Sequence, residues 1–297
     1  MTVYEHVANS VLQSLNGELP EWRRPWRQMR AQGLSTLPIN ADTGRAYRGI
    51  NAFLLWKRGD KDMRYLTFRQ AQRLGGHVRK GEHGTGIVFW KSQQHTAKDL
   101  TTGEEKSKRS LLLRYFTVFN ITQCEGLELP PVTPVAIPPR MENIYRQLDA
   151  RVEHGGNEAF YAEGLDLVAL PVPEAFSCED AYSTTAFHEI GHWTSHPTRL
   201  NRTFNAHKSS ENYALEELVA EFCSTYLDAY FGIDMMLEHH ASYIQHWRRL
   251  CTDQPRALLT CASRAQAAAD YILQRVGAAI ESICSDAQSE ELEAAET

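Results

Sequence analysis

Apolar residues recur at helical spacing in several stretches of the chain, and each of these stretches predicts a helix that buries one face. Helix-ending residues follow some of them, such as Gly75 and Gly76 after residues 69–74 and Pro197 after residues 178–195. The predicted helices are residues 3–15, 52–56, 69–74, 140–154, 178–195, 212–230, 238–252 and 255–284.

Shorter runs rich in aromatic and β-branched residues predict strands. Residues 86–90 and 111–120 form one predicted pair, joined by a polar loop over residues 91–110, and residues 160–161 and 165–170 form another. Small sheets among many helices indicate the α+β class. We expect a small α+β domain first, followed by a mostly helical domain with a small sheet.

A proline-rich segment separates two halves of opposite charge. Residues 1–126 carry 20 Lys and Arg against 11 Asp and Glu, a net charge of +9, whereas residues 127–297 carry −15. Five prolines between residues 129 and 139 favour a stiff, extended spacer. The predicted organisation is a basic domain over 1–126, a linker over 127–139, a second domain over 140–284 and a flexible acidic tail over 285–297.

The basic half interleaves aromatic and cationic side chains. Lys and Arg attract phosphates, and aromatic rings stack on unpaired bases whatever their sequence, so this composition favours binding of single-stranded nucleic acid. The alternative is that most of the rings belong to the core and that the arginines lie on a solvated face. The candidate DNA-binding residues are Trp22, Arg23, Arg24, Trp26, Tyr47, Arg48, Arg79, Lys80 and Trp90.

The acidic half contains His188, Glu189 and His192 within one predicted helix. Two histidines four residues apart lie on one helical face, where both rings can reach a single divalent ion, and the glutamate beside the first can contact a water on that ion. This pattern is typical of zinc hydrolases. A catalytic zinc site also needs a third protein ligand and leaves its fourth position open for water.

Glu217, on the next predicted helix, is the candidate third ligand. It borders the apolar stripe of that helix, as does Glu221 four residues later, and a cation there would offset the cost of burying a carboxylate. Glu221 is expected behind the ligands, where it accepts the free ring N–H of one histidine. The alternative is a solvated acidic helix edge, which fits Glu216 best.

Several motifs together resemble the ArdC-type antirestriction proteins of conjugative plasmids. The similarity extends over nearly the whole chain, and the motifs occur in the same order. They are residues 47–51, 66–71, 75–81 and 119–123 in the basic half, and residues 188–194, 199–202 and 216–221 in the acidic half.

This resemblance implies an N-terminal domain that binds single-stranded DNA and a C-terminal zincin-like metallopeptidase domain. It also implies that the protein shields incoming plasmid DNA from restriction in a new host cell. In zincins with a glutamate ligand the pattern is E-x-x-A or E-x-x-x-D; residues 217–221 fit the first, and Glu221 replaces the Asp of the second. A more distant similarity to SprT-like proteases, which use a third histidine, keeps His196 and His207 as alternatives.

The reaction expected of such a site is peptide hydrolysis. Bound Zn2+ lowers the pKa of its water to about 7, and Glu189 would take the proton during attack on a peptide carbonyl and pass it to the leaving amine. Mn2+ also suits these ligands. The candidate donors to the developing oxyanion are Tyr213, His239, His240 and Tyr243.

Other features of the sequence indicate a cytoplasmic protein. No apolar run approaches the ~20 residues of a membrane span, and six cysteines without a C-x-x-C pair indicate free thiols. Three functions remain open: a DNA-tethered metallopeptidase that cuts an unidentified protein, such as a host protein bound to DNA; a single-stranded-DNA-binding protein with a structural or inactive metal site, protecting DNA by occlusion alone; and a regulatory interaction protein. The sequence names neither the protein substrate nor the oligomeric state.

Overall fold

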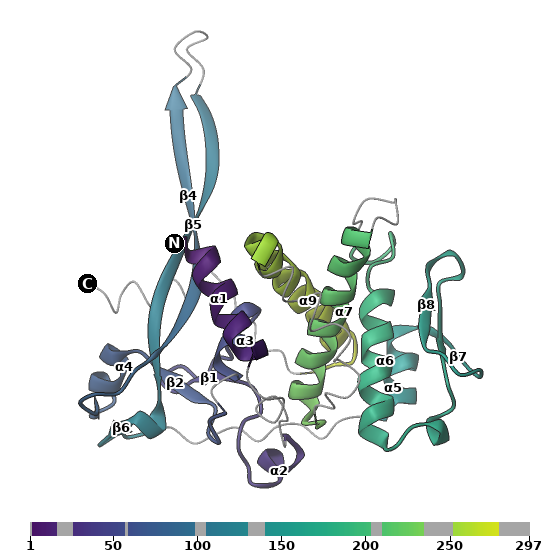
Figure 1. The fold of residues 1–297 in the computed structure, drawn as a ribbon, viewed down its shortest axis with the longest axis horizontal. Helices are drawn as coiled ribbons and strands as arrows, with labels where there is room; N and C mark the ends of the chain where they lie inside the picture. The colour runs from purple at the N-terminus through teal and green to yellow at the C-terminus, as the bar shows by residue number, and fades with distance from the viewer. Residues whose placement is uncertain are drawn as a thin grey trace.

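The fold of the protein, a computed structural model, combines small sheets with long helices (Figure 1). Helix α9 (Pro255–Arg275) lies between α1 (Val3–Asn16) of the basic half and α7 (Ser210–Phe231) of the acidic half, and it packs against both. The predicted α+β class is therefore confirmed.

The structure describes residues 2–16, 26–56, 59–98, 105–129, 140–202, 210–234 and 252–278.

The basic half is built on a four-stranded sheet of order β1-β2-β5-β4, beside a two-stranded sheet of β3 and β6. Short helices surround these sheets. The strands are β1 (Ile39–Asn40), β2 (Arg64–Leu66), β3 (His77–Val78), β4 (Thr85–Lys98), β5 (Glu105–Asn120) and β6 (Cys124–Glu125), and the helices are α2 (Trp26–Ala31), α3 (Ile50–Trp56) and α4 (Phe68–Arg73).

Strands β4 and β5 form a long antiparallel hairpin that projects from the sheet (Figure 1). Pairing continues as far as Lys98 opposite Glu105, so most of the loop predicted over residues 91–110 is strand instead. The prediction was wrong because it relied on apolar side chains. Backbone hydrogen bonds between two strands extend the ladder through polar sequence as well.

The acidic half begins with α5 (Met141–Leu148) and a three-stranded sheet of order β7-β9-β8. The helix predicted over residues 140–154 ends early, because Asp149 adopts a left-handed conformation (φ 54°) and the chain then pairs as a strand. Strand β7 runs parallel to β9, and β8 runs antiparallel to it at an edge that packs against α6 (Glu179–Trp193). The strands are β7 (Arg151–His154), β8 (Phe160–Ala162) and β9 (Leu167–Leu170).

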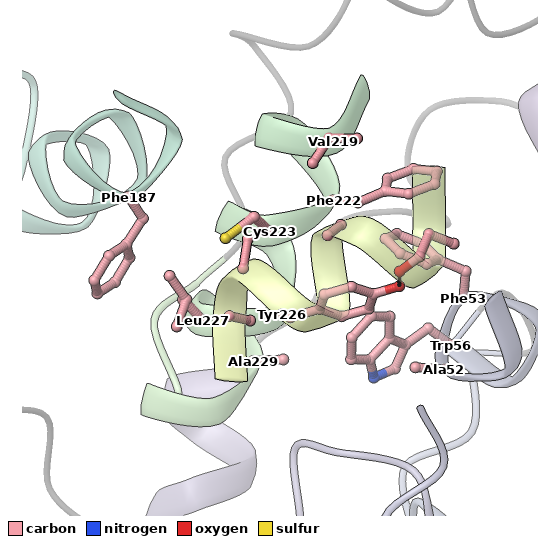
Figure 2. Packing of buried hydrophobic residues seen from close by; sticks show 14 of the residues in the cluster. Ala52, Phe53, Trp56, Phe187, Val219, Phe222, Cys223, Tyr226, Leu227 and Ala229 are labelled. Carbon is pink, nitrogen blue, oxygen red and sulfur yellow. Dashed lines mark hydrogen bonds between the residues drawn. The ribbon is translucent and has the colours of Figure 1, made fainter. Parts of the chain in front are cut away.

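A single cluster of buried apolar side chains runs through both halves. Phe53 of α3 packs against Phe222 of α7 with ring centroids 4.2 Å apart, and Trp56 lies beside Tyr226, with 6.1 Å between ring centroids (Figure 2). A second, smaller cluster in the basic half consists of Ala41, Leu66 and Ala71, and Leu127 packs against it. The two charge-defined halves therefore share one core.

Polar contacts cross the same boundary. The Thr36 hydroxyl donates to the Ala229 carbonyl at 2.5 Å, and the Gly49 N–H donates to Gln266 Oε1 at 3.0 Å. Two ion pairs join the halves as well, Arg27 with Asp180 and Arg48 with Asp270.

Some predicted segments lie outside the described residues: 130–139 of the linker, 238–251 of one helix, and 279–297 with the tail. Within the described part of the chain, no helix is both long and apolar enough to cross a membrane.

Candidate metal centre

Helices α6 and α7 approach closely at one glycine. A Cβ built on Gly191 would lie only 3.1 Å from Ala220 Cα, closer than side chains normally come to a backbone atom. Both residues are fully buried. A glycine facing an alanine therefore lets the two helix backbones come close, so that side chains of α6 and α7 beside this crossing can contact each other.

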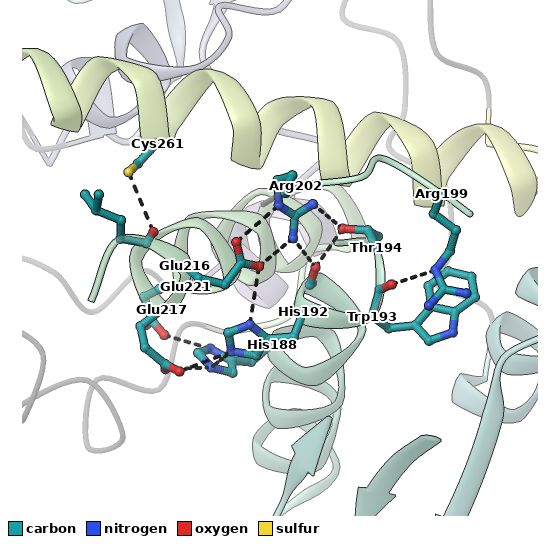
Figure 3. Close-up of polar contacts among 12 residues, drawn as sticks. His188, His192, Trp193, Thr194, Arg199, Arg202, Glu216, Glu217, Glu221 and Cys261 are labelled. Atoms are coloured by element: carbon teal, nitrogen blue, oxygen red, sulfur yellow. Dashed lines mark hydrogen bonds and ion pairs between the residues drawn. The ribbon is translucent and has the colours of Figure 1, made fainter. Parts of the chain in front are cut away.

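His188 and His192 of α6 meet Glu217 of α7 at this crossing (Figure 3). His188 Nε2 lies 3.4 Å from Glu217 Oε2, His192 Nε2 lies 3.4 Å from Glu217 Oε1, and the two Nε2 atoms are 3.2 Å apart. One ligand atom from each residue falls within 4.8 Å of the others. The structure thus brings together two residues of one predicted helix and one residue of the next.

A carboxylate lies behind each histidine, on the ring nitrogen that faces away from Glu217. Glu221 Oε2 is 3.1 Å from His188 Nδ1, and Glu216 Oε1 is 3.5 Å from His192 Nδ1. A carboxylate at Nδ1 fixes the proton there and leaves the Nε2 lone pair for another partner. Both rings present Nε2 to the same point between them.

Glu216 is the residue whose position the sequence reading missed. Instead of forming a solvated helix edge, it is mostly buried and pairs with Arg202, whose guanidinium nitrogen is 2.7 Å from Glu216 Oε1. The hydrogen bonds of His192 and Arg202 outweigh the effect of burial and lower the pKa of Glu216. The signal in the sequence was Arg202 itself, a cation in the polar segment between the two site helices.

The buried carboxylate of Glu217 is held ionised by its neighbours. Burial opposes ionisation, but the facing imidazoles of His188 and His192 outweigh it and hold the pKa of Glu217 well below its usual range. With only 7% of its side chain exposed, Glu217 is an anion largely removed from water. Such a group requires positive charge nearby.

Glu189 and Tyr213 complete the surroundings. Glu189 is buried next to the first histidine in α6. Partial burial and a hydrogen bond to Glu217 raise the pKa of Tyr213 to about 12, although much of its ring is exposed. Of the four candidate oxyanion donors, Tyr213 lies at this site, and His239, His240 and Tyr243 lie outside the described residues.

The alternative third histidines are not part of the group that the structure describes. His196 hydrogen-bonds the Thr198 hydroxyl at 2.8 Å in the turn after α6, and the group able to hold a metal ion is His188, His192 and Glu217. His207 lies outside the described residues.

Two of the candidate DNA-binding residues are buried in the structure. Trp26 is fully buried, its ring centroid 5.5 Å from that of Trp56, and Tyr47 is buried with a hydrogen bond from Asn40. Neither ring can stack on a base. Tryptophan and tyrosine are amphipathic, so composition alone did not distinguish the core from the surface. Arg48 forms an ion pair with Asp270 and keeps 24% of its side chain exposed, so it stays a candidate.

The other candidates stand differently. Arg79 pairs with Glu82 at 2.6 Å but keeps two fifths of its side chain exposed, and Lys80 is exposed. Trp90 lies in β4. Trp22, Arg23 and Arg24 lie outside the described residues.

Two family models match the chain, one in each half. Residues 1–119 match the model for the N-terminal domain of the anti-restriction factor ArdC, and residues 139–264 match that for zincin-like metallopeptidases. Two Escherichia coli proteins named DNA primase TraC are 34% and 35% identical over 91% of the chain. The chain spans only 20% and 27% of their length.

Two relatives match along most of their length. An uncharacterised protein of Sinorhizobium fredii, y4eC, is 33% identical, with 91% of both chains covered. The crystal structures of the antirestriction ArdC protein from the R388 plasmid, metal-free and Mn(II)-bound, match at TM-scores of 0.76 and 0.72 and at 32% and 31% identity. These matches cover 93% of this chain and 98% of the R388 chains. The chain therefore belongs to the ArdC family of antirestriction proteins.

Proposed function

We propose that this protein binds single-stranded DNA and uses a metal-dependent peptidase site against a protein near that DNA, and that it thereby protects incoming plasmid DNA from restriction in the host cytoplasm. The observation that carries the proposal is the convergence of His188, His192 and Glu217, with one ligand atom of each within 4.8 Å of the others. An antirestriction family and a zincin-like domain agree with it.

The donor set fits a divalent ion. Two imidazole Nε2 atoms and one carboxylate face a common point, and each imidazole has a carboxylate at its other nitrogen. Two His and one Glu are the ligands of catalytic zinc sites, and they suit Mn2+ too. The R388 relative has been crystallised with Mn(II), which supports a divalent metal without fixing its identity here.

His188, His192 and Glu217 would hold the ion, and their three side chains leave room for a water molecule and a substrate carbonyl. The bound ion would supply Lewis acidity, which polarises the carbonyl and acidifies the water. Glu189 would accept a proton from that water and return it to the leaving amine. The Tyr213 hydroxyl, near Glu217, is the proposed hydrogen-bond donor to the oxygen that becomes negative.

The basic half supplies the proposed contact with DNA. Its net charge of +9 attracts phosphates, and its large exposed rings among the described residues are Phe68 and Tyr115. Arg79, Lys80 and Trp90 remain candidates from the sequence. Holding DNA on the same chain as the peptidase site would raise the local concentration of proteins bound to that DNA.

A second function follows from the same charge distribution. A domain of charge +9 can coat single strands and deny restriction enzymes their site without any catalysis. The metal site would then be structural or inactive. The two functions differ in whether Glu189 is needed.

The variant Glu189→Gln separates them. It keeps the size and burial of the side chain but cannot accept the proton, so we expect unchanged metal and oligonucleotide binding, loss of peptidase activity by at least about 100-fold, and loss of plasmid protection in a conjugation assay. If protection survives unchanged, occlusion is the route and proteolysis is not. If metal binding is lost too, the variant does not test the reaction, and Tyr213→Phe provides the second comparison.

A further inference from the structure

We infer that Arg202 and Glu216 form a positioning pair that fixes His192 for metal binding. This inference rests on the proposed metal site and extends it beyond the three ligands. Neither residue would touch the ion or the substrate. Their part is to hold one imidazole in the orientation that the ion requires.

The Arg202 guanidinium is held by both site helices at once (Figure 3). It donates to the Gly191 carbonyl at 2.7 Å and to the Thr194 hydroxyl at 2.5 Å at the C-terminal end of α6, and to Glu216 of α7 at 2.7 Å. Only 5% of the Arg202 side chain is exposed. The planar guanidinium can serve three acceptors in fixed directions, which a lysine ammonium cannot reproduce.

Glu216 passes this constraint to the metal site. The same oxygen, Oε1, that accepts from Arg202 lies 3.5 Å from His192 Nδ1. On the other side of the ring, His192 Nε2 faces Glu217 at 3.4 Å. The ring is therefore held between two glutamates that are adjacent in sequence, and Glu216 is itself anchored by Arg202.

Charge explains why an arginine is needed. Glu216, Glu217 and Glu221 place three carboxylates on two turns of one helix, all within reach of the two histidines. Arg202 offsets the charge of Glu216. Glu216 can therefore orient His192 without adding a further uncompensated negative charge to a site that already contains the carboxylates of Glu189, Glu217 and Glu221.

The test is a double-mutant cycle of Arg202→Ala and Glu216→Gln, with the dissociation constant of Zn2+ measured by competition against a chromophoric chelator. Loss of a residue behind a metal ligand typically weakens metal binding about 10–100-fold. We expect each single variant to fall in this range. We also expect the double variant to bind no more weakly than the worse single one, because Arg202 acts through Glu216. Arg202→Lys should recover only part of the affinity.

A matched control is available in the same segment. Arg199 is also mostly buried, with 8% of its side chain exposed, and it also donates to an α6 carbonyl, that of Trp193, at 2.6 Å. Its ion-pair partner is Asp166, which lies in the turn between β8 and β9 and not on either site helix. Arg199→Ala should lower the melting temperature of the metal-free protein while leaving the Zn2+ affinity within about twofold of the wild type.

The outcomes separate the inference from the proposed function. A wild-type protein that binds no Zn2+ or Mn2+ contradicts the metal site itself. If the wild type binds and Glu216→Gln binds equally well, the positioning pair is wrong and the metal site stands. Additive losses in the double variant, or tighter binding by Arg202→Ala, would show that the two residues act separately and would overturn the pair. Glu216→Gln keeps the shape of the side chain, so the test does not depend on how well Arg202→Ala folds.

Discussion

Single residues set the spacing of the site, and Gly191 is the clearest case. A methyl group there would meet Ala220 Cα at 3.1 Å, so α6 and α7 would have to separate by some tenths of an ångström. We expect Gly191→Ala to destabilise the protein by about 1–3 kcal/mol through overpacking and to weaken Zn2+ binding. Thermal unfolding with and without metal measures both effects.

Gly164 provides the control for this prediction. A Cβ at Gly164 would meet nothing within 4 Å, so Gly164→Ala should change stability by no more than about 0.5 kcal/mol. Equal effects at the two glycines would mean that backbone freedom, and not helix spacing, explains the loss at Gly191.

The buried carboxyl group of Asp228 should make the free energy of unfolding depend on pH. Burial raises the pKa of Asp228 well above its usual value, although a hydrogen bond from Thr184 at 2.8 Å opposes the shift. A carboxyl group whose folded pKa is raised stabilises the protein below its unfolded pKa, near 4, and that stability is lost as the pH rises towards the folded pKa. We expect Asp228→Asn to be more stable than the wild type at pH 7, by on the order of 1–3 kcal/mol, and similar to it at pH 4.

Urea unfolding from pH 4 to pH 8 tests this sign. Asp149→Asn is a suitable comparison, because Asp149 is exposed and asparagine also tolerates its left-handed backbone. A wild type that gains stability relative to Asp228→Asn as the pH rises would show that Asp228 is ionised when folded.

How much of the site the sequence could predict depends on the range of each contact. His188 and His192 are one helical turn apart, and Glu217 borders an apolar stripe, so periodicity alone indicated that they face inward. Arg202 and Glu216 could not be paired in this way, since their contact depends on the path of the intervening segment. Trp26 and Tyr47 were misplaced because a ring suits the core and a base equally well.

At the level of elements, α3 and α7 join the halves. Phe53 is 4% exposed and packs against Phe222, so Phe53→Ala should lower the free energy of unfolding by about 3–5 kcal/mol. Because the core is shared, we expect one cooperative transition in which tryptophan fluorescence and far-UV circular dichroism coincide. Phe68→Ala, at a ring that is 49% exposed, should cost much less. Two separate transitions would contradict a shared core.

The predicted elements agree with the structure where side-chain periodicity dictates the backbone. Helices α6 and α7 lie within two residues of their predicted bounds. Periodicity failed where backbone conformation or backbone pairing sets the end of an element. The left-handed backbone of Asp149 ends α5, and cross-strand pairing extends β4 to Lys98. Neither effect leaves an apolar pattern in the sequence.

At the scale of the whole molecule, opposite charges meet across one interface. The sequence predicted a boundary near residue 130 from charge and proline content, and the matched family models also fall on either side of it. The buried ring contacts between α3 and α7 could not be predicted, because they pair residues 169 to 173 positions apart. Proposed DNA binding and proposed peptidase chemistry therefore belong to one folded unit.

The metal centre is the central claim, and anomalous X-ray scattering from a crystal soaked in Zn2+ tests it most directly. We predict one strong peak at the zinc edge, bound by His188 Nε2, His192 Nε2 and a Glu217 oxygen at about 2.0–2.2 Å, and its absence from crystals of Glu217→Ala. No peak at the α6–α7 crossing, or a peak there without Glu217 among its ligands, would contradict the account.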